Sequence, residues 1–245
     1  VYYGLKNDGC EVIADRLSEK QFSVPIGVSI AKTNSLNTVD LESGIADYRK
    51  AMEALKDVGD YFVVNISCPN AFGGEPFAAP ERLDALLTSL DKVETSKPVL
   101  LKVAVDMSRK EFNRLIDIAD GHRVHGFILS NLTKDRSRST IDQKEIQATP
   151  KGGISGRPTA EPSNQLISHL YKKAGDRYVI VGVGGIFSAD DAYEKILCGA
   201  SLVQLATGMV FRGPQLIGQI NKGLAQRLRH YGFDTIAQAV GSKHR

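Results

Sequence analysis

The chain has 245 residues, of which 42% are hydrophobic and 24% are charged, and its formal net charge is +3. This composition is ordinary for a globular protein, and the length allows one sizeable core. The basic residues are scattered along the chain, which disfavours a nucleic-acid-binding protein. No apolar run approaches the roughly 18 residues of a membrane-spanning helix.

The three cysteines, Cys10, Cys68 and Cys198, show neither CxxC spacing nor an even-numbered framework. This pattern disfavours structural disulfides and a zinc site, so we expect no bound metal and a reducing compartment. Cys10 and Cys198 lie in segments with helical spacing, and we expect them to be structural.

Short apolar runs rich in valine and isoleucine recur along the chain, at residues 24–30, 61–67, 99–105, 126–131, 178–185 and 202–208. They are continuous rather than alternating, which is typical of strands buried on both faces. Segments with helical spacing lie between them, including 40–58, 80–93 and 188–200. The alternation predicts a parallel sheet with right-handed crossovers.

Each apolar run ends in small or polar residues, namely Ser29, Asn65, Lys102, Asn131, Gly184 with Gly185, and Thr207 with Gly208. An open doubly wound sheet would accommodate six strands. A (β/α)8 TIM barrel would instead bring all six ends to one face, where the active site of such barrels lies. We favour the barrel, and we expect residues 1–245 to form one partial barrel domain that holds strands three to eight and lacks the first two.

The longest connection, residues 133–163, shows no convincing helix before about Asn164. Its first half is consistent either with a lid over the catalytic face or with a solvated excursion. Its second half contains "GGISGRP", residues 152–158, whose glycines suit close approach of the backbone to a ligand.

Two glycine-containing turns follow the last two predicted strands. One contains Gly184 and Gly185, and the other is the "LATG" segment, residues 205–208. Barrels often bind phosphate groups in these loops, through backbone N–H groups and a helix N-terminus. Tight turns without a ligand are the simpler alternative, but the repeated pattern favours a phosphorylated cofactor or substrate.

Two reactive side chains lie at predicted strand ends. Lys102 interrupts an apolar strand, a costly position unless its ammonium group meets negative charge at the site. Cys68 follows a strand end between Asn65 and Asn70, where it is a candidate for proton chemistry rather than a packed thiol. Together with Asn131, these asparagines are suited to hold a flat polar ring such as a pyrimidine.

The motifs "VVNISCPN", "LLKVAVD", "FILSN", "GGISGRP", "IVGVGGI" and "GASLVQLATG" occur in this order over nearly the whole chain. Together they resemble the dihydroorotate dehydrogenase family. The resemblance implies a barrel that binds FMN and oxidises dihydroorotate to orotate in pyrimidine synthesis.

The resemblance also implies roles for single residues. Cys68 is the implied base that removes a proton from C5 of dihydroorotate while C6 gives a hydride to the flavin, and Lys102 lies near the flavin N1–C2 edge. The implied substrate-binding residues are Asn65, Asn70, Asn131, Leu132, Gly4 and Leu5. The implied flavin-binding residues are Ser29, Asn65, Lys102, Ser130, Ser155, Gly156, Gly184, Gly185, Ala206 and Thr207.

Different motifs of this chain resemble two different classes of the family. The "GGISGRP" loop and the C-terminal tail resemble the membrane-associated, quinone-using class, whereas a cysteine base is typical of the soluble class. We expect quinone as the acceptor, peripheral membrane contact through a missing N-terminal segment, and a location on the cytoplasmic side of the inner membrane or in the cytoplasm. A soluble-class enzyme with another acceptor, a tRNA dihydrouridine synthase and an inactive flavin-binding remnant are the alternatives.

Overall fold

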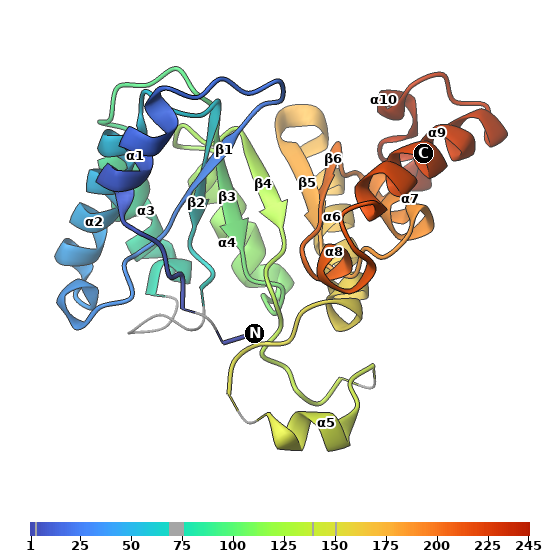
Figure 1. The fold of residues 1–245 in the computed structure, drawn as a ribbon, viewed down its shortest axis with the longest axis horizontal. Helices are drawn as coiled ribbons and strands as arrows, with labels where there is room; N and C mark the ends of the chain where they lie inside the picture. Colours follow the sequence, from blue (N-terminus) through green and yellow to red (C-terminus); the bar gives the residue numbers. More distant parts are fainter. Residues whose placement is uncertain (3, 69–75, 139, 150) are drawn as a thin grey trace. The chain divides into compact units, whose positions relative to one another are not determined.

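A computed structural model describes residues 1–2, 4–68, 76–138, 140–149 and 151–245. The chain divides into two compact units, which are described separately (Figure 1). The N-terminal unit comprises Tyr2–Val103 and Lys110–His125. The C-terminal unit comprises Val1, Ala104–Arg109 and Gly126–Arg245.

The N-terminal unit is built on three parallel strands, β1 (Gly27–Ile30), β2 (Tyr61–Asn65) and β3 (Val99–Val103). Its helices are α1 (Cys10–Ser18), α2 (Leu41–Leu55), α3 (Pro80–Leu90) and most of α4 (Arg109–Ala119). Short 3-10 turns occur at Leu36–Thr38 and Pro76–Ala78.

Helices α2, α3 and α4 each bury one apolar stripe, whereas α1 has no buried residue. In α2 the buried stripe contains Tyr48, Met52 and Leu55, which recur at helical spacing. Asp40 caps the start of α2, because its carboxylate accepts a hydrogen bond from the N–H of Ser43 at 2.9 Å. In α4 the stripe is Phe112, Leu115, Ile116 and Ala119.

The C-terminal unit contains the parallel strands β4 (Gly126–Leu129), β5 (Val179–Val183) and β6 (Leu202–Gln204). Its helices are α5 (Gln143–Ala148), α6 (Ala160–Ala174), α7 (Ala189–Cys198), α8 (Thr207–Arg212), α9 (Leu216–His230) and α10 (Ile236–Ala239). Further 3-10 turns occur at Arg157–Thr159, Gly175–Arg177 and Ser242–His244.

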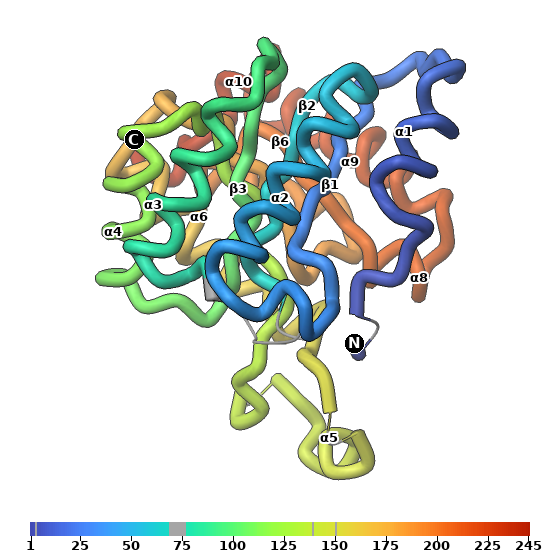
Figure 2. The backbone as a smooth tube through the Cα atoms, turned by 90° about the vertical axis from the view of Figure 1, so that its left-hand side faces the viewer, coloured from blue at the N-terminus to red at the C-terminus, as the bar shows by residue number. Residues whose placement is uncertain are grey.

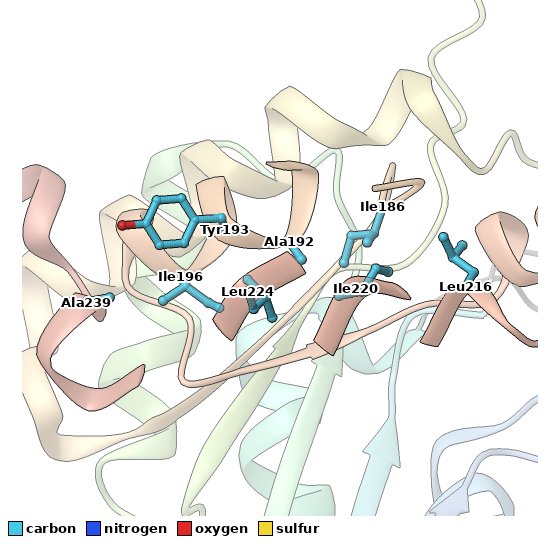
Figure 3. Packing of buried hydrophobic residues seen from close by; sticks show 8 residues of the cluster. All are labelled: Ile186, Ala192, Tyr193, Ile196, Leu216, Ile220, Leu224 and Ala239. Carbon is cyan, nitrogen blue, oxygen red and sulfur yellow. The ribbon is translucent and has the colours of Figure 1, made fainter. Parts of the chain in front are cut away.

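An apolar cluster holds α7 against α9 in the C-terminal unit. Figure 3 shows its buried members, which are Ile186, Ala192, Tyr193, Ile196, Leu216, Ile220, Leu224 and Ala239. The cluster begins at Ile186, immediately after the glycine turn that follows β5. The packing of α7 on α9 therefore also anchors that turn.

The predicted strands are confirmed, because each of the six apolar runs contains one strand of the described structure. The prediction for residues 133–163 was wrong in two respects. It missed α5, and α6 begins at Ala160 rather than near Asn164. Pro162 obscured this start, yet proline is tolerated in the first turn of a helix, where its missing N–H would have no intrahelical acceptor.

The segment with α5 extends away from the strands of its own unit in both backbone views (Figures 1 and 2). Its base is fixed by Asp106, whose carboxylate accepts hydrogen bonds from Thr133 Oγ1 and the N–H of Lys134, both at 2.6 Å, and pairs with Arg138 at 3.0 Å. None of the described helices is long and apolar enough to cross a bilayer.

His122 links two segments of the N-terminal unit through a hydrogen-bonded ion pair. Its Nδ1 lies 2.8 Å from Asp91 Oδ2, and its Nε2 lies 3.2 Å from Asp84 Oδ1. Burial lowers the pKa of His122, but the hydrogen bonds to Asp91 and Asp84 outweigh it and raise the pKa above its ordinary value.

We predict that His122→Gln lowers the free energy of unfolding by about 1–2 kcal/mol at pH 6, the net value of one or two hydrogen bonds. Because the pKa is raised in the folded state, the contribution is fully present below about pH 6.5 and is lost as pH rises through the folded pKa. Urea unfolding from pH 5.5 to 9 should show the wild type and the variant converging. A constant difference across this range would contradict the prediction, and His230→Gln on α9 is the exposed control.

Candidate functional site

Strand register brings Asn65 and Lys102 together in the N-terminal unit. The two residues are paired across β2 and β3, so their side chains leave the same face of the sheet. Val63 and Leu100 lie on this face two pairs earlier, and the exposed Ser29 of β1 is paired with Val63. Ser29, Asn65 and Lys102 therefore share a face of the sheet, and their predicted ligand contacts stay predictions.

Asn65 is held rigidly at the end of β2. Its backbone carbonyl accepts a hydrogen bond from the buried Tyr48 hydroxyl at 2.8 Å. Its side-chain Oδ1 accepts hydrogen bonds from the Ser67 hydroxyl at 3.1 Å and the Ser67 N–H at 3.3 Å. These bonds use the oxygen of the Asn65 amide, which leaves its NH2 group to donate to a ligand.

Cys68 is half-buried and lies three residues beyond the end of β2. Burial lowers the pKa of Lys102, and the charge of a Cys68 thiolate opposes this effect. Lys102 has no ion pair with a carboxylate among the described residues. Asn70 lies outside the described residues, and its role stays a prediction.

Gly4 and Leu5 precede α1 with positive φ angles of 79° and 60°. A Cβ atom at Gly4 would lie 2.9 Å from Asn34 Nδ2, so this bend packs on Asn34. The predicted contact of Gly4 and Leu5 with substrate stays a prediction.

The turn after β5 packs directly on the start of α6. Gly184 and Gly185 have φ angles of 115° and 70°. A Cβ atom at Gly184 would lie 2.6 Å from Thr159 Oγ1, and one at Gly185 would lie 2.4 Å from the Cβ of Ala160. Glycine is therefore required at both positions for backbone conformation and for space.

The loop before α6 also meets the loop after β6. Thr207 Oγ1 lies 2.9 Å from Ser155 Oγ, and a Cβ atom at Gly156 would lie 3.2 Å from the methyl group of Thr207. Ala206 directly precedes Thr207 at the start of α8. The structure therefore gathers the predicted residues Ser155, Gly156, Gly184, Gly185, Ala206 and Thr207 in one part of the C-terminal unit.

The N-terminus of α7 is capped by its own residues. Ser188 accepts a hydrogen bond from the N–H of Asp191, and the Asp191 carboxylate accepts bonds from the N–H of Phe187 and the Ser188 hydroxyl. Asp190 adds a second carboxylate in this first turn. The negative charges of Asp190 and Asp191 would repel a phosphate at the N-terminus of α7. The N–H groups of the preceding loop are therefore the better donors for an anion.

The end of β4 presents a buried hydroxyl group. Ser130 is 2% exposed, and its Oγ has no hydrogen-bond partner among the described residues. Asn131 Oδ1 accepts a bond from the N–H of Leu132 at 2.9 Å. The Leu132 side chain fills the space above Gly153, where a Cβ atom would lie 1.9 Å from Leu132 Cδ1. The substrate contacts of Asn131 and Leu132 stay predictions.

Residues 2–228 match the family model described as dihydroorotate dehydrogenase. The chain belongs to this family. It is 38% identical to the dihydroorotate dehydrogenase (quinone) of Synechococcus elongatus, with 98% of the chain and 65% of the relative covered. It is 39% identical to the protein of that name from Rhodococcus erythropolis, with 98% and 67% covered. The chain thus spans about two thirds of the length of these relatives.

The solved structures agree with the sequence comparisons. Ligand-free DHODH from Eimeria tenella superposes with a TM-score of 0.83 at 27% identity, and the match covers 96% of this chain and 69% of that one. The complex of the same enzyme with ferulenol gives a TM-score of 0.83 at 26% identity. The predicted fold class, a partial (β/α)8 barrel, is confirmed.

Sequence reasoning missed Lys32 in this dihydroorotate dehydrogenase family member. Lys32 follows β1 and is 4% exposed, with its Nζ 3.4 Å from Thr38 Oγ1. Burial lowers its pKa, and the charges of Asp47 and Cys68 oppose that effect. A signal was present in "GVSIAK", because a lysine two residues after an apolar strand lies at a strand end, where the other site candidates were found.

We predict that Gly185→Ala lowers the free energy of unfolding by about 2–4 kcal/mol, because it adds overpacking against Ala160 to an unfavourable positive φ. Gly175→Ala is the matched control, since Gly175 has a φ of 60° and nothing within 4 Å of an added Cβ. It should show only the backbone cost of about 1–2 kcal/mol. Equal losses in the two variants, measured by urea unfolding, would contradict close packing of the turn.

Proposed function

We propose that this chain forms the FMN-binding part of a quinone-dependent dihydroorotate dehydrogenase, which oxidises dihydroorotate to orotate. The observation that carries the proposal is the pairing of Asn65 with Lys102 on one face of the sheet, with Cys68 three residues after Asn65. This arrangement combines an amide for ring recognition, a cation and a proton acceptor at one strand end. The names of the curated relatives support the same reaction.

In this proposal Cys68 removes the proton from C5 of dihydroorotate while a hydride leaves C6. A thiolate is a competent base, and the positively charged side chains of Lys32 and Lys102 lie nearby. Asn65, Asn70 and Asn131 orient the flat substrate ring through their amide groups. Leu132, Gly4 and Leu5 complete the proposed substrate contacts.

The described residues fit FMN on two observations. The buried Ser130 hydroxyl lacks a partner in the described structure, and a ligand atom would satisfy it. The Gly184–Gly185 turn packs on Thr159 and Ala160 and has no side chains of its own, and Gly156 lies beside Thr207, so these loops suit backbone contact with a phosphate. FMN, when bound, supplies the acceptor for the hydride.

We propose quinone as the final electron acceptor, because curated relatives at 38–39% identity carry that acceptor in their names. Peripheral contact with the cytoplasmic side of the inner membrane is part of the same proposal, since quinones dissolve in lipid. Reoxidation of the reduced flavin by a soluble acceptor such as fumarate or a nicotinamide, and not by quinone, would contradict the proposed acceptor.

We expect the purified protein to bind added FMN and to lose the flavin absorption band near 450 nm when dihydroorotate is added without oxygen. Reoxidation by a short-chain quinone should restore the band. Protein that binds FMN but is not bleached would indicate a flavin-binding remnant, and bleaching without quinone reoxidation would indicate another acceptor. A protein that binds no flavin would refute the proposal.

We predict that Cys68→Ala slows flavin reduction by dihydroorotate by roughly 10²–10⁴-fold, the usual contribution of a general base. FMN and orotate should still bind, because the asparagine and loop contacts remain. Cys68→Ser should retain partial activity. Stopped-flow measurement of flavin absorbance provides the rate, with Cys10→Ala as the control for losing a thiol elsewhere. A parent rate in Cys68→Ala would show that Cys68 is only a packed thiol.

We predict that Lys102→Met makes the midpoint potential of the bound flavin more negative and slows its reduction. The cause is the loss of a positive charge that would stabilise anionic reduced flavin. Spectroscopic titration against a reference dye measures the potential, and the exposed Lys110→Met on α4 is the control. Unchanged potential and unchanged FMN affinity would contradict the assigned role of Lys102.

A further inference from the structure

Lys195 is a buried lysine on α7 that the sequence analysis passed over. It is 1% exposed and lies on the apolar face of the helix with Ala192 and Ile196. Its aliphatic stem packs on β5 at Gly182, where a Cβ atom would lie 3.0 Å from Lys195 Cδ. Gly182, the first glycine of "VGVGG", therefore leaves room for the lysine stem and for Ile167, whose Cδ1 would be equally close.

The Lys195 ammonium group is held by neutral oxygen atoms. Its Nζ donates hydrogen bonds to Ser163 Oγ and Asn164 Oδ1, both at 2.9 Å. No carboxylate among the described residues forms an ion pair with it. Burying a cation without an ion pair costs free energy. The hydrogen bonds to Ser163 and Asn164 must therefore hold the Lys195 ammonium group in a defined position.

The bond from Lys195 fixes the direction of the Ser163 hydroxyl. Ammonium can only donate, so Ser163 Oγ must accept from it and point its single hydrogen elsewhere. Ser163 Oγ lies 2.9 Å from the carbonyl oxygen of Leu129 and 2.8 Å from that of Val183. The hydroxyl hydrogen is thus shared between the last residues of β4 and β5.

These two carbonyl groups adjoin the proposed cofactor contacts. Leu129 precedes Ser130, and Val183 precedes Gly184. The carbonyl of Val183 also accepts the N–H of Ser130 at 3.1 Å. Because a peptide unit is planar, fixing the Val183 carbonyl also fixes the direction of the Gly184 N–H.

We propose that Lys195 is a positioning residue for the cofactor phosphate: through Ser163 it fixes the Val183–Gly184 peptide and thereby aims the N–H groups of the Gly184–Gly185 turn. This inference rests on the proposed binding of FMN. Burial lowers the pKa of Lys195 to about 8, although the charges of Cys198, Asp191, Glu161 and Glu194 oppose the shift. The lowered pKa is consistent with an ammonium held by neutral acceptors.

The test compares the dissociation constants of FMN and riboflavin, which differ by the phosphate alone. We expect Lys195→Met to weaken FMN binding roughly tenfold while riboflavin binding changes less than threefold. Ser163→Ala should give the same selective loss, and the double variant should be no worse than either single variant, because both residues act in one chain of hydrogen bonds. Lys222→Met, an exposed change on α9, is the control.

The outcomes separate the two proposals. Wild-type protein that binds neither flavin refutes the proposed function and this inference with it. Wild-type protein that prefers FMN, together with a Lys195→Met variant that keeps the same preference, refutes the positioning role alone. If Lys195→Met does not fold, Ser163→Ala decides the question, and an unchanged FMN-to-riboflavin ratio in that variant overturns the inference.

Discussion

The parallel register of β2 on β3 is the constraint from which the proposed chemistry follows. Parallel pairing places paired residues on one face, so the register decides that Asn65 lies beside Lys102. A slip of β2 by one residue would turn Asn65 to the opposite face of the sheet and separate it from Lys102. Burial of the apolar face against the helices therefore fixes the strand register that places the polar pair on the opposite face.

Lysines largely withdrawn from solvent occur in both units: Lys32 and Lys195 are buried, and Lys102 is half-buried. Lys32 and Lys102 lie near Cys68, whereas Lys195 donates hydrogen bonds to a hydroxyl and an amide oxygen. Burial lowers the pKa of all three, because desolvation disfavours the charged form. The first two are suited to stabilising an anion at the site, and the third is suited to orienting backbone groups.

The glycines of the C-terminal unit serve different purposes that composition alone does not separate. Gly182 accommodates the stem of Lys195, whereas Gly184 and Gly185 let the turn after β5 approach Thr159 and Ala160. The apolar cluster that begins at Ile186 then fixes this turn from the other side. A turn held at both ends can present its N–H groups to a phosphate with little further loss of conformational entropy.

The sequence by itself determined the six strands, the positions of Asn65, Lys102 and Gly184 near strand ends, and the family. Continuous apolar runs and strand-end residues are local signals, and local pattern is enough to read them. Only the tertiary structure decided the start of α6 at Ala160, the burial of Lys32, and the path from Lys195 through Ser163 to β4 and β5. These features depend on contacts between different elements, such as that of Lys195 with Ser163, whose packing no periodicity encodes.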